Sequence, residues 1–169
     1  TFPKSVGQIP LYYAHKNTGR PLKEGKWFEK FRSNYLDVDN DALYPFGYGL
    51  SYTTFRFSDI TLNRSSIGMD NELVASVTVT NTGDRAGSEV VQLYIRDLVG
   101  SVTRPVKELK GFEKIYLQPN ESRTVRFTIA PEMLKFYNAD LKFVAEPGDF
   151  DVMIGPDSRN VKTARFTLH

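Results

Sequence analysis

From residue 51 onward, hydrophobic and polar residues alternate in short runs that end at turn residues. In the clearest run, the odd positions of residues 73–79 are apolar, and a turn sequence follows at 81–84. Such a period of two places alternate side chains on opposite faces of a β-strand. Similar runs lie at 91–95, 125–129, 150–154 and 164–168. Each run predicts a strand with one buried face, and we expect a single core that contains Val77, Val79, Val91, Leu93, Val125, Phe127, Val152, Ile154 and Phe166.

Two further runs are irregular. The apolar phase of residues 55–57 does not match that of residues 60–62, which predicts a β-bulge at residues 58–59. Gly111 lies in the middle of an apolar run and predicts a second bulge or bend, because glycine weakens a regular strand. Residues 131–135 begin with proline, which is tolerated at the first position of a helix, so one helical turn is expected there.

These runs amount to about seven short strands, without a long helical pattern. The sequence therefore predicts an all-β fold, an immunoglobulin-like β-sandwich. The region contains neither cysteine nor tryptophan, so the Cys–Trp–Cys pattern of true immunoglobulin domains is absent. A fibronectin-III-like sandwich over residues 51–169 is the better interpretation.

Residues 1–50, here called the lead-in, show no sustained period of 2 or 3.6. Glycine and proline interrupt the segment repeatedly, and it is rich in aromatic residues, including Trp27. A flexible linker would instead be rich in glycine and serine or in charge. We therefore expect an irregular, aromatic-rich extension that packs against another part of the protein, with its boundary near Ser51.

Composition excludes several classes of function. The chain has 169 residues and no apolar run near the roughly 20 residues needed to span a bilayer, so no membrane span is expected. Lys and Arg number 22 against 20 Asp and Glu, which argues against nucleic acid as a partner. There are no cysteines, which removes disulfides, thiolate metal sites and a cysteine nucleophile.

The sequence offers no set of catalytic residues and no cofactor motif. A hydrolytic triad needs a histidine, and only His15 and the terminal His169 are available. Asp149 and Asp151 flank the inward-facing Phe150, so both point outward from the sandwich. Glycoside hydrolysis needs two carboxyl groups on opposite sides of one sugar, an arrangement that this pair does not suggest.

One acidic segment partly matches a calcium-binding loop. Asp37, Asp39 and Asp41 alternate, but Ala42 and Tyr48 stand where such a loop needs glycine and glutamate. We expect a solvated acidic turn here, with calcium as the less favoured alternative, and no metal site.

Several motifs resemble those of family-3 β-glucosidases, and together they cover most of the chain. Residues 6–13 (VGQIPLYY) and 18–21 (TGRP) resemble the end of that family's second domain. Residues 43–55 (LYPFGYGLSYTTF) are similar to the segment that leads into its fibronectin-III-like domain. Residues 77–94 and 104–112 resemble that domain itself. The chain departs from the pattern at Ala14, where family members mostly carry asparagine.

The resemblance implies the C-terminal part of a retaining, exo-acting β-glucosidase. In that family the nucleophilic aspartate and the general-acid glutamate belong to domains that would precede residue 1. This chain is then a non-catalytic accessory segment that stabilises and clamps the catalytic domains, its partners in the same polypeptide. The resemblance also implies a β-glucoside substrate for the parent and a periplasmic or extracellular location. An autonomous carbohydrate-binding module and an adhesion or scaffold domain remain alternatives.

The lead-in supplies the candidate binding residues. Aromatic rings can stack on sugars or pack between domains, and both uses remain open. The candidates for substrate contact are Tyr12, Tyr13, His15, Arg20 and Trp27. The candidates for interdomain anchors are Tyr44, Phe46, Tyr48 and Tyr52, whereas residues 1–35 are expected to be held more loosely. Apolar surface left exposed in the isolated chain would favour a partner chain or self-association.

Overall fold

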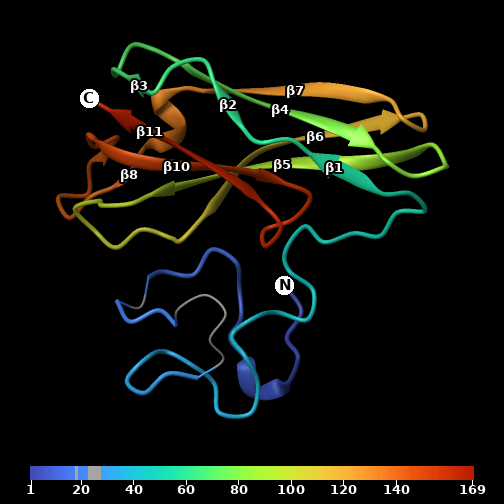
Figure 1. Cartoon of the computed structure of the whole chain (residues 1–169). Coiled ribbons are helices and arrows are strands. Elements are labelled where there is room, and N and C mark those ends of the chain that lie inside the picture. The colour runs from blue at the N-terminus through green and yellow to red at the C-terminus, as the bar shows by residue number, and fades with distance from the viewer. Residues whose placement is uncertain (18, 23–27) are drawn as a thin grey trace.

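The computed structural model describes residues 1–17, 19–22 and 28–169 and consists mainly of β-strands (Figure 1). The strands are β1 (Phe55–Phe57), β2 (Thr61–Leu62), β3 (Ser66–Ile67), β4 (Leu73–Asn81), β5 (Gly87–Asp97), β6 (Glu108–Leu117), β7 (Ser122–Ile129), β8 (Phe136–Tyr137), β9 (Phe143–Val144), β10 (Gly148–Gly155) and β11 (Lys162–Leu168). Two short 3-10 helices complete the described elements, η1 (Val6–Gln8) and η2 (Pro131–Leu134). The second confirms the helical turn that the sequence predicts.

Two sheets pack face to face to form the sandwich (Figure 1). In the four-stranded sheet, β1 and β2 pair with one side of β4, and β7 pairs with the other side. The five-stranded sheet has the order β3-β11-β10-β5-β6. This division of antiparallel strands between two layers is the fibronectin-III-like arrangement that the alternating runs predict.

Both predicted bulges are present. Phe57 pairs with Val79 and Thr61 with Ser76, so β1 and β2 advance four residues while β4 advances three. The extra residue restores the inward phase in β2. In the β5–β6 pair the register shifts at Gly111, which pairs with Leu93. The first bulge keeps the apolar side chains of its run directed at the core, whereas the second pairs Leu109 with Tyr94 and so turns Leu109 to the outer face of the sheet.

The core lies between the two sheets. Eight of the nine residues that we expected to share it are buried there; the exception is Phe127, which is half-buried and packs against the core from its edge. Its ring lies next to Gly111 of the edge strand β6, and glycine has no side chain to cover it. By contrast, Phe150 and Phe166 are fully enclosed and stack with ring centroids 5.4 Å apart.

The expectation of one buried face for each strand is wrong for β5. Val91, Leu93 and Ile95 face the core as predicted, but Gln92 and Tyr94 on the opposite face are only 5% and 0% exposed. The reason is the lead-in, which lies against the outer side of the five-stranded sheet (Figure 1). A second layer therefore covers a face that a free-standing sandwich would expose to water.

Tyr13 is the main aromatic contact between the lead-in and the sheet. Its ring stacks on Phe46 with centroids 4.3 Å apart and meets Tyr94 of β5 edge-on at 5.8 Å. The backbone N–H of Leu109 in β6 donates a hydrogen bond to the Tyr13 hydroxyl at 3.4 Å. Burial raises the pKa of the Tyr94 phenol far above its ordinary value, so this hydroxyl stays neutral and donates to Gln92 Oε1 at 2.6 Å.

Hydrogen bonds fix the position of the lead-in backbone. Gln92 Nε2 donates to the carbonyl oxygen of Gly47 at 3.2 Å. Gly47 has a φ of 80°, and a Cβ at this position would collide with the Gln92 amide, so only glycine fits here. Ser158 N donates to Phe46 O at 2.9 Å.

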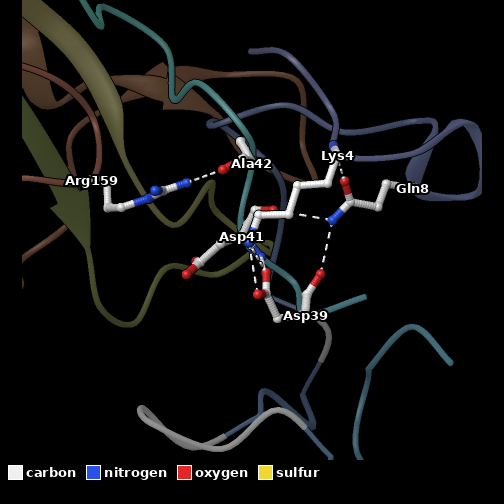
Figure 2. Close-up of polar contacts among 6 residues, drawn as sticks. All are labelled: Lys4, Gln8, Asp39, Asp41, Ala42 and Arg159. Carbon is white, nitrogen blue, oxygen red and sulfur yellow. Dashed lines mark hydrogen bonds and ion pairs between the residues drawn. The ribbon is translucent and has the colours of Figure 1, made fainter. Parts of the chain in front are cut away.

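A charged side chain adds a further link between the two parts. The Arg159 guanidinium donates to the carbonyl oxygen of Ala42, which is 117 residues away in the sequence (Figure 2).

Apart from η1, the described part of the lead-in contains only isolated bridges, including Lys16 with Pro105. No described helix is long and apolar enough to cross a membrane.

We expect Phe150→Ala to lower the free energy of unfolding by about 3–5 kcal/mol, because it removes a fully buried ring. Phe127→Ala should cost clearly less, since that ring is already half-exposed at the sandwich edge. Chemical denaturation of the two variants measures both values. Equal losses would contradict the placement of Phe127.

Arg159→Met removes the charged donor to Ala42 O while keeping most of the side-chain volume. We expect a loss of about 1 kcal/mol, below the roughly 1.5–3 kcal/mol of hydrogen bonds to charged groups, because Arg159 lies at the surface. Hydrogen exchange of amides near residue 42 should accelerate, while exchange in β4 stays unchanged. The control is Arg165→Met, which breaks an ion pair with Asp151 on the outer surface of the sandwich, away from the lead-in contact with Arg159. Unchanged exchange near residue 42 would rule out the link.

Candidate functional site

The lead-in is organised around a buried amide rather than an apolar core. Gln8 is 0% exposed. Its Oε1 accepts a hydrogen bond from Lys4 N at 2.5 Å, and its Nε2 donates to Asp39 O at 2.8 Å and Asp41 O at 3.1 Å (Figure 2). Tyr35 donates its hydroxyl proton to Gln8 O at 2.8 Å. The Gln8 side chain thus joins the N-terminal segment to residues 39–41, and its own buried amide is fully hydrogen-bonded.

The acidic segment belongs to the same structure. Lys4 Nζ lies 2.6 Å from Asp39 Oδ1, and the same oxygen accepts a hydrogen bond from Asp41 N at 2.9 Å (Figure 2). The hydrogen bond from Lys4 lowers the pKa of Asp39, so the ion pair is lost only as the pH falls through that lowered value. Among the described residues, no group of His, Cys, Asp or Glu side chains is arranged to hold a metal ion. The geometry is that of a structural acidic turn.

Three of the expected substrate contacts lie together at one pocket. The pocket has a volume of about 180 Å³, and its walls include Tyr12, Tyr13 and His15. We call it the seam pocket, because Lys107 and Arg159 of the sandwich form its other side. The Tyr12 and His15 rings meet nearly perpendicularly, with centroids 6.4 Å apart.

The other two candidates lie elsewhere. Arg20 is on the surface, where its backbone oxygen accepts a hydrogen bond from Ser33 N at 2.9 Å, and it does not line the seam pocket. Trp27 lies outside the described residues. The sequence also gave no indication of Lys107 or Arg159 as pocket residues, since both come from sandwich loops distant in the chain.

The four expected interdomain anchors divide into three groups. Phe46 is half-buried and faces inward, where it stacks on Tyr13. Tyr44 and Tyr48 stack on each other at 5.1 Å and remain 45% and 44% exposed. Tyr52 is almost fully exposed. The stacked pair Tyr44 and Tyr48 faces outward from the same turn that attaches the lead-in to the sandwich.

Tyr44 and Tyr48 line a shallow depression that we call the aromatic groove. It has a volume of about 530 Å³, and Phe2, Pro45 and Leu50 complete most of its apolar wall. The Phe2 ring meets Tyr44 edge-on at 6.2 Å. Contiguous apolar surface of this kind is typical of a contact with another protein surface.

Three aspartates of the sandwich are committed to local structure. Asp149 Oδ1 accepts a hydrogen bond from the Thr167 hydroxyl at 2.7 Å, and Asp151 pairs with Arg165 Nε at 2.9 Å. Both lie on the outer face, as the alternation predicts. Asp157 accepts hydrogen bonds from the backbone N–H groups of the turn that follows it. These groups stabilise strands and turns.

Comparison with known proteins identifies the sandwich and the lead-in together. Residues 89–158 match the model of the fibronectin type III-like domain. The chain is 55% identical over 168 residues to the periplasmic beta-glucosidase of Salmonella typhimurium, covering 99% of this chain and 22% of that protein. A putative beta-xylosidase of Formosa agariphila is 47% identical over 168 residues, with 99% and 21% covered.

A solved structure extends the agreement to three dimensions. The crystal structure of beta-glucosidase from Listeria innocua in complex with glucose matches with a TM-score of 0.93 and 42% identity, covering 99% of this chain and 23% of that chain. The chain therefore spans about a fifth of the length of these relatives, and the match includes the irregular lead-in as well as the sandwich. The chain therefore corresponds to the C-terminal part of a family-3 glycoside hydrolase, the part that carries the fibronectin type III-like domain.

Proposed function

We propose that this chain is the non-catalytic C-terminal accessory segment of a retaining β-glucosidase that hydrolyses terminal β-D-glucosyl residues. In this role the aromatic groove docks on the preceding catalytic domains of the same polypeptide. The sandwich holds the lead-in in the conformation that presents the groove. The relatives' names support the parent activity, and the periplasmic relative supports a location in the periplasm.

The observation that carries the proposal is the exposure of the groove. Tyr44 and Tyr48 present stacked rings, while Phe2 and Leu50 beside them are 67% and 89% exposed. Water contact with this much apolar surface is unfavourable, and aromatic residues bury large areas for a small loss of side-chain freedom. The relatives contain roughly four times as much chain again, which supplies a covering surface.

The stabilising role follows from how the groove is supported. Phe46 lies between Pro45 and Gly47 in the groove wall, and it stacks inward on Tyr13. A domain bound at the groove would therefore be coupled through one turn to the outer face of β5. Docking would stabilise the lead-in against local unfolding because it binds only the ordered form.

The chain alone should show no β-glucosidase activity. Asp149 and Asp151 are engaged in contacts with the neighbouring strand β11, and the resemblance assigns the catalytic pair to preceding domains. Release of 4-nitrophenol from the aryl β-glucoside should remain at background. Turnover that copurifies with the chain and disappears in Asp151→Asn would contradict the proposal.

Docking can be measured with the preceding domains and this chain as two purified polypeptides. We expect a complex by calorimetry, and Tyr44→Ser or Tyr48→Ser should each weaken it about tenfold or more, as truncation of a central aromatic side chain does. The matched control is Tyr137→Ser, an aromatic residue 66% exposed on β8. Full affinity in both groove variants would exclude the groove as the docking surface. A different outcome is that no complex with the preceding domains forms, while ultracentrifugation shows self-association that the groove variants abolish. The partner of the groove would then be a second copy of this chain and not the catalytic domains.

A further inference from the structure

The seam pocket is preformed by contacts between the lead-in and the sandwich. His15 O accepts a hydrogen bond from Val106 N at 2.9 Å, and Lys16 forms a β-bridge with Pro105. These contacts place the His15 loop beside Lys107. Ligand sites are commonly such largely preformed concavities at the junction of two structural units.

Tyr12 supplies an apolar surface at the pocket. Its side chain is 53% exposed although the edge-on contact with His15 holds the ring in place. An exposed, fixed aromatic ring presents an electron-rich face that attracts the partly positive C–H groups on one side of a sugar ring.

Polar groups beside this ring offer unsatisfied hydrogen-bonding capacity. Lys107 Nζ donates to Ser158 O at 2.6 Å, which uses only part of the donor capacity of an ammonium group. Asn40 also lines the pocket, and its Nδ2 donates to Ser33 O at 2.8 Å. Its Oδ1 is buried and has no hydrogen-bond partner among the described residues. A ligand hydroxyl can accept from the ammonium and donate to an amide oxygen.

Charge and size narrow the class of ligand. Lys107 and Arg159 each direct their charge at a backbone carbonyl, and the acidic residue Asp41 also lines the pocket. Burial lowers the pKa of Lys107, which weakens its preference for the charged state. Both cationic side chains already donate to carbonyl oxygens and an acidic residue lies beside them, so an anion is not favoured. The volume of about 180 Å³ is below the roughly 300–1,000 Å³ of pockets for larger ligands.

We infer that the seam pocket binds one neutral pyranose unit, with its C–H face on Tyr12 and its hydroxyls near Asn40 and Lys107. The choice of a sugar rests on the proposed function, because the relatives are β-glucosidases and β-xylosidases. The site adjoins the aromatic groove at Pro45, but the groove residues Tyr44 and Tyr48 do not line it. It gives the accessory segment a sugar contact in addition to its docking surface.

The test is a titration of the ¹⁵N-labelled chain with methyl β-D-glucopyranoside and methyl β-D-xylopyranoside, followed by NMR. Saturable shifts should centre on the amides of Tyr12, His15 and Lys107. Tyr12→Ala should weaken binding by about tenfold or more, equivalent to 1.4 kcal/mol. Tyr12→Phe should retain binding, because the ring face is kept. Both variants should have the same melting temperature as the unsubstituted chain, since the Tyr12 side chain is half-exposed.

Two controls make the result decisive. Tyr137→Ala removes an exposed aromatic residue elsewhere and should leave binding unchanged. Mannitol, an acyclic polyol, should cause no saturable shifts. Absence of saturable shifts with either glycoside, equal shifts with mannitol, or unchanged binding by Tyr12→Ala would overturn the inference. Groove variants at Tyr44 and Tyr48 test docking separately, so loss of docking with intact sugar binding would count against the proposed function alone.

Discussion

The burial of the outer face of β5 by the lead-in is the interaction on which the rest of the structure depends. Tyr94 and Gln92 lie on that face, fully or nearly removed from water, with Tyr13 and Gly47 against them. The exchange is mutual. The sheet gains a cover for a large aromatic side chain, and the lead-in gains a rigid support that its own sequence does not provide.

The lead-in needs this support because its centre is polar. The fully buried side chain at the centre of the lead-in is Gln8, where a sandwich core would have an apolar residue. Its hydrogen bonds join residues 4, 39 and 41. Hydrogen bonds of this kind specify a geometry but contribute little net stability, since the unfolded chain bonds to water instead. Specific geometry from Gln8 and apolar burial from Tyr13 together explain how an irregular segment keeps one conformation.

The candidate functional surfaces both result from this attachment. The turn at Pro45 and Phe46 separates them: Pro45 lines the seam pocket and also the aromatic groove. Holding that turn against Gln92 and Ser158 therefore fixes the walls of both surfaces at once. The charged groups also have structural roles, because Asp39 and Asp151 form ion pairs and Asp157 stabilises a turn.

The sequence by itself determined the sandwich. Period-two alternation identified the longer strands and most of the core but not the two-residue strands β3, β8 and β9. Breaks in that alternation located both bulges, because such breaks depend on residues adjacent in the chain. The motifs of the lead-in also indicated the family. Only the tertiary structure decided that β5 is buried on both faces, that Gln8 is buried, and that Tyr12 and Lys107 line one pocket. Those features arise from contacts such as Arg159 with Ala42, 117 residues apart, and a local pattern carries no information about which distant segment will cover a face.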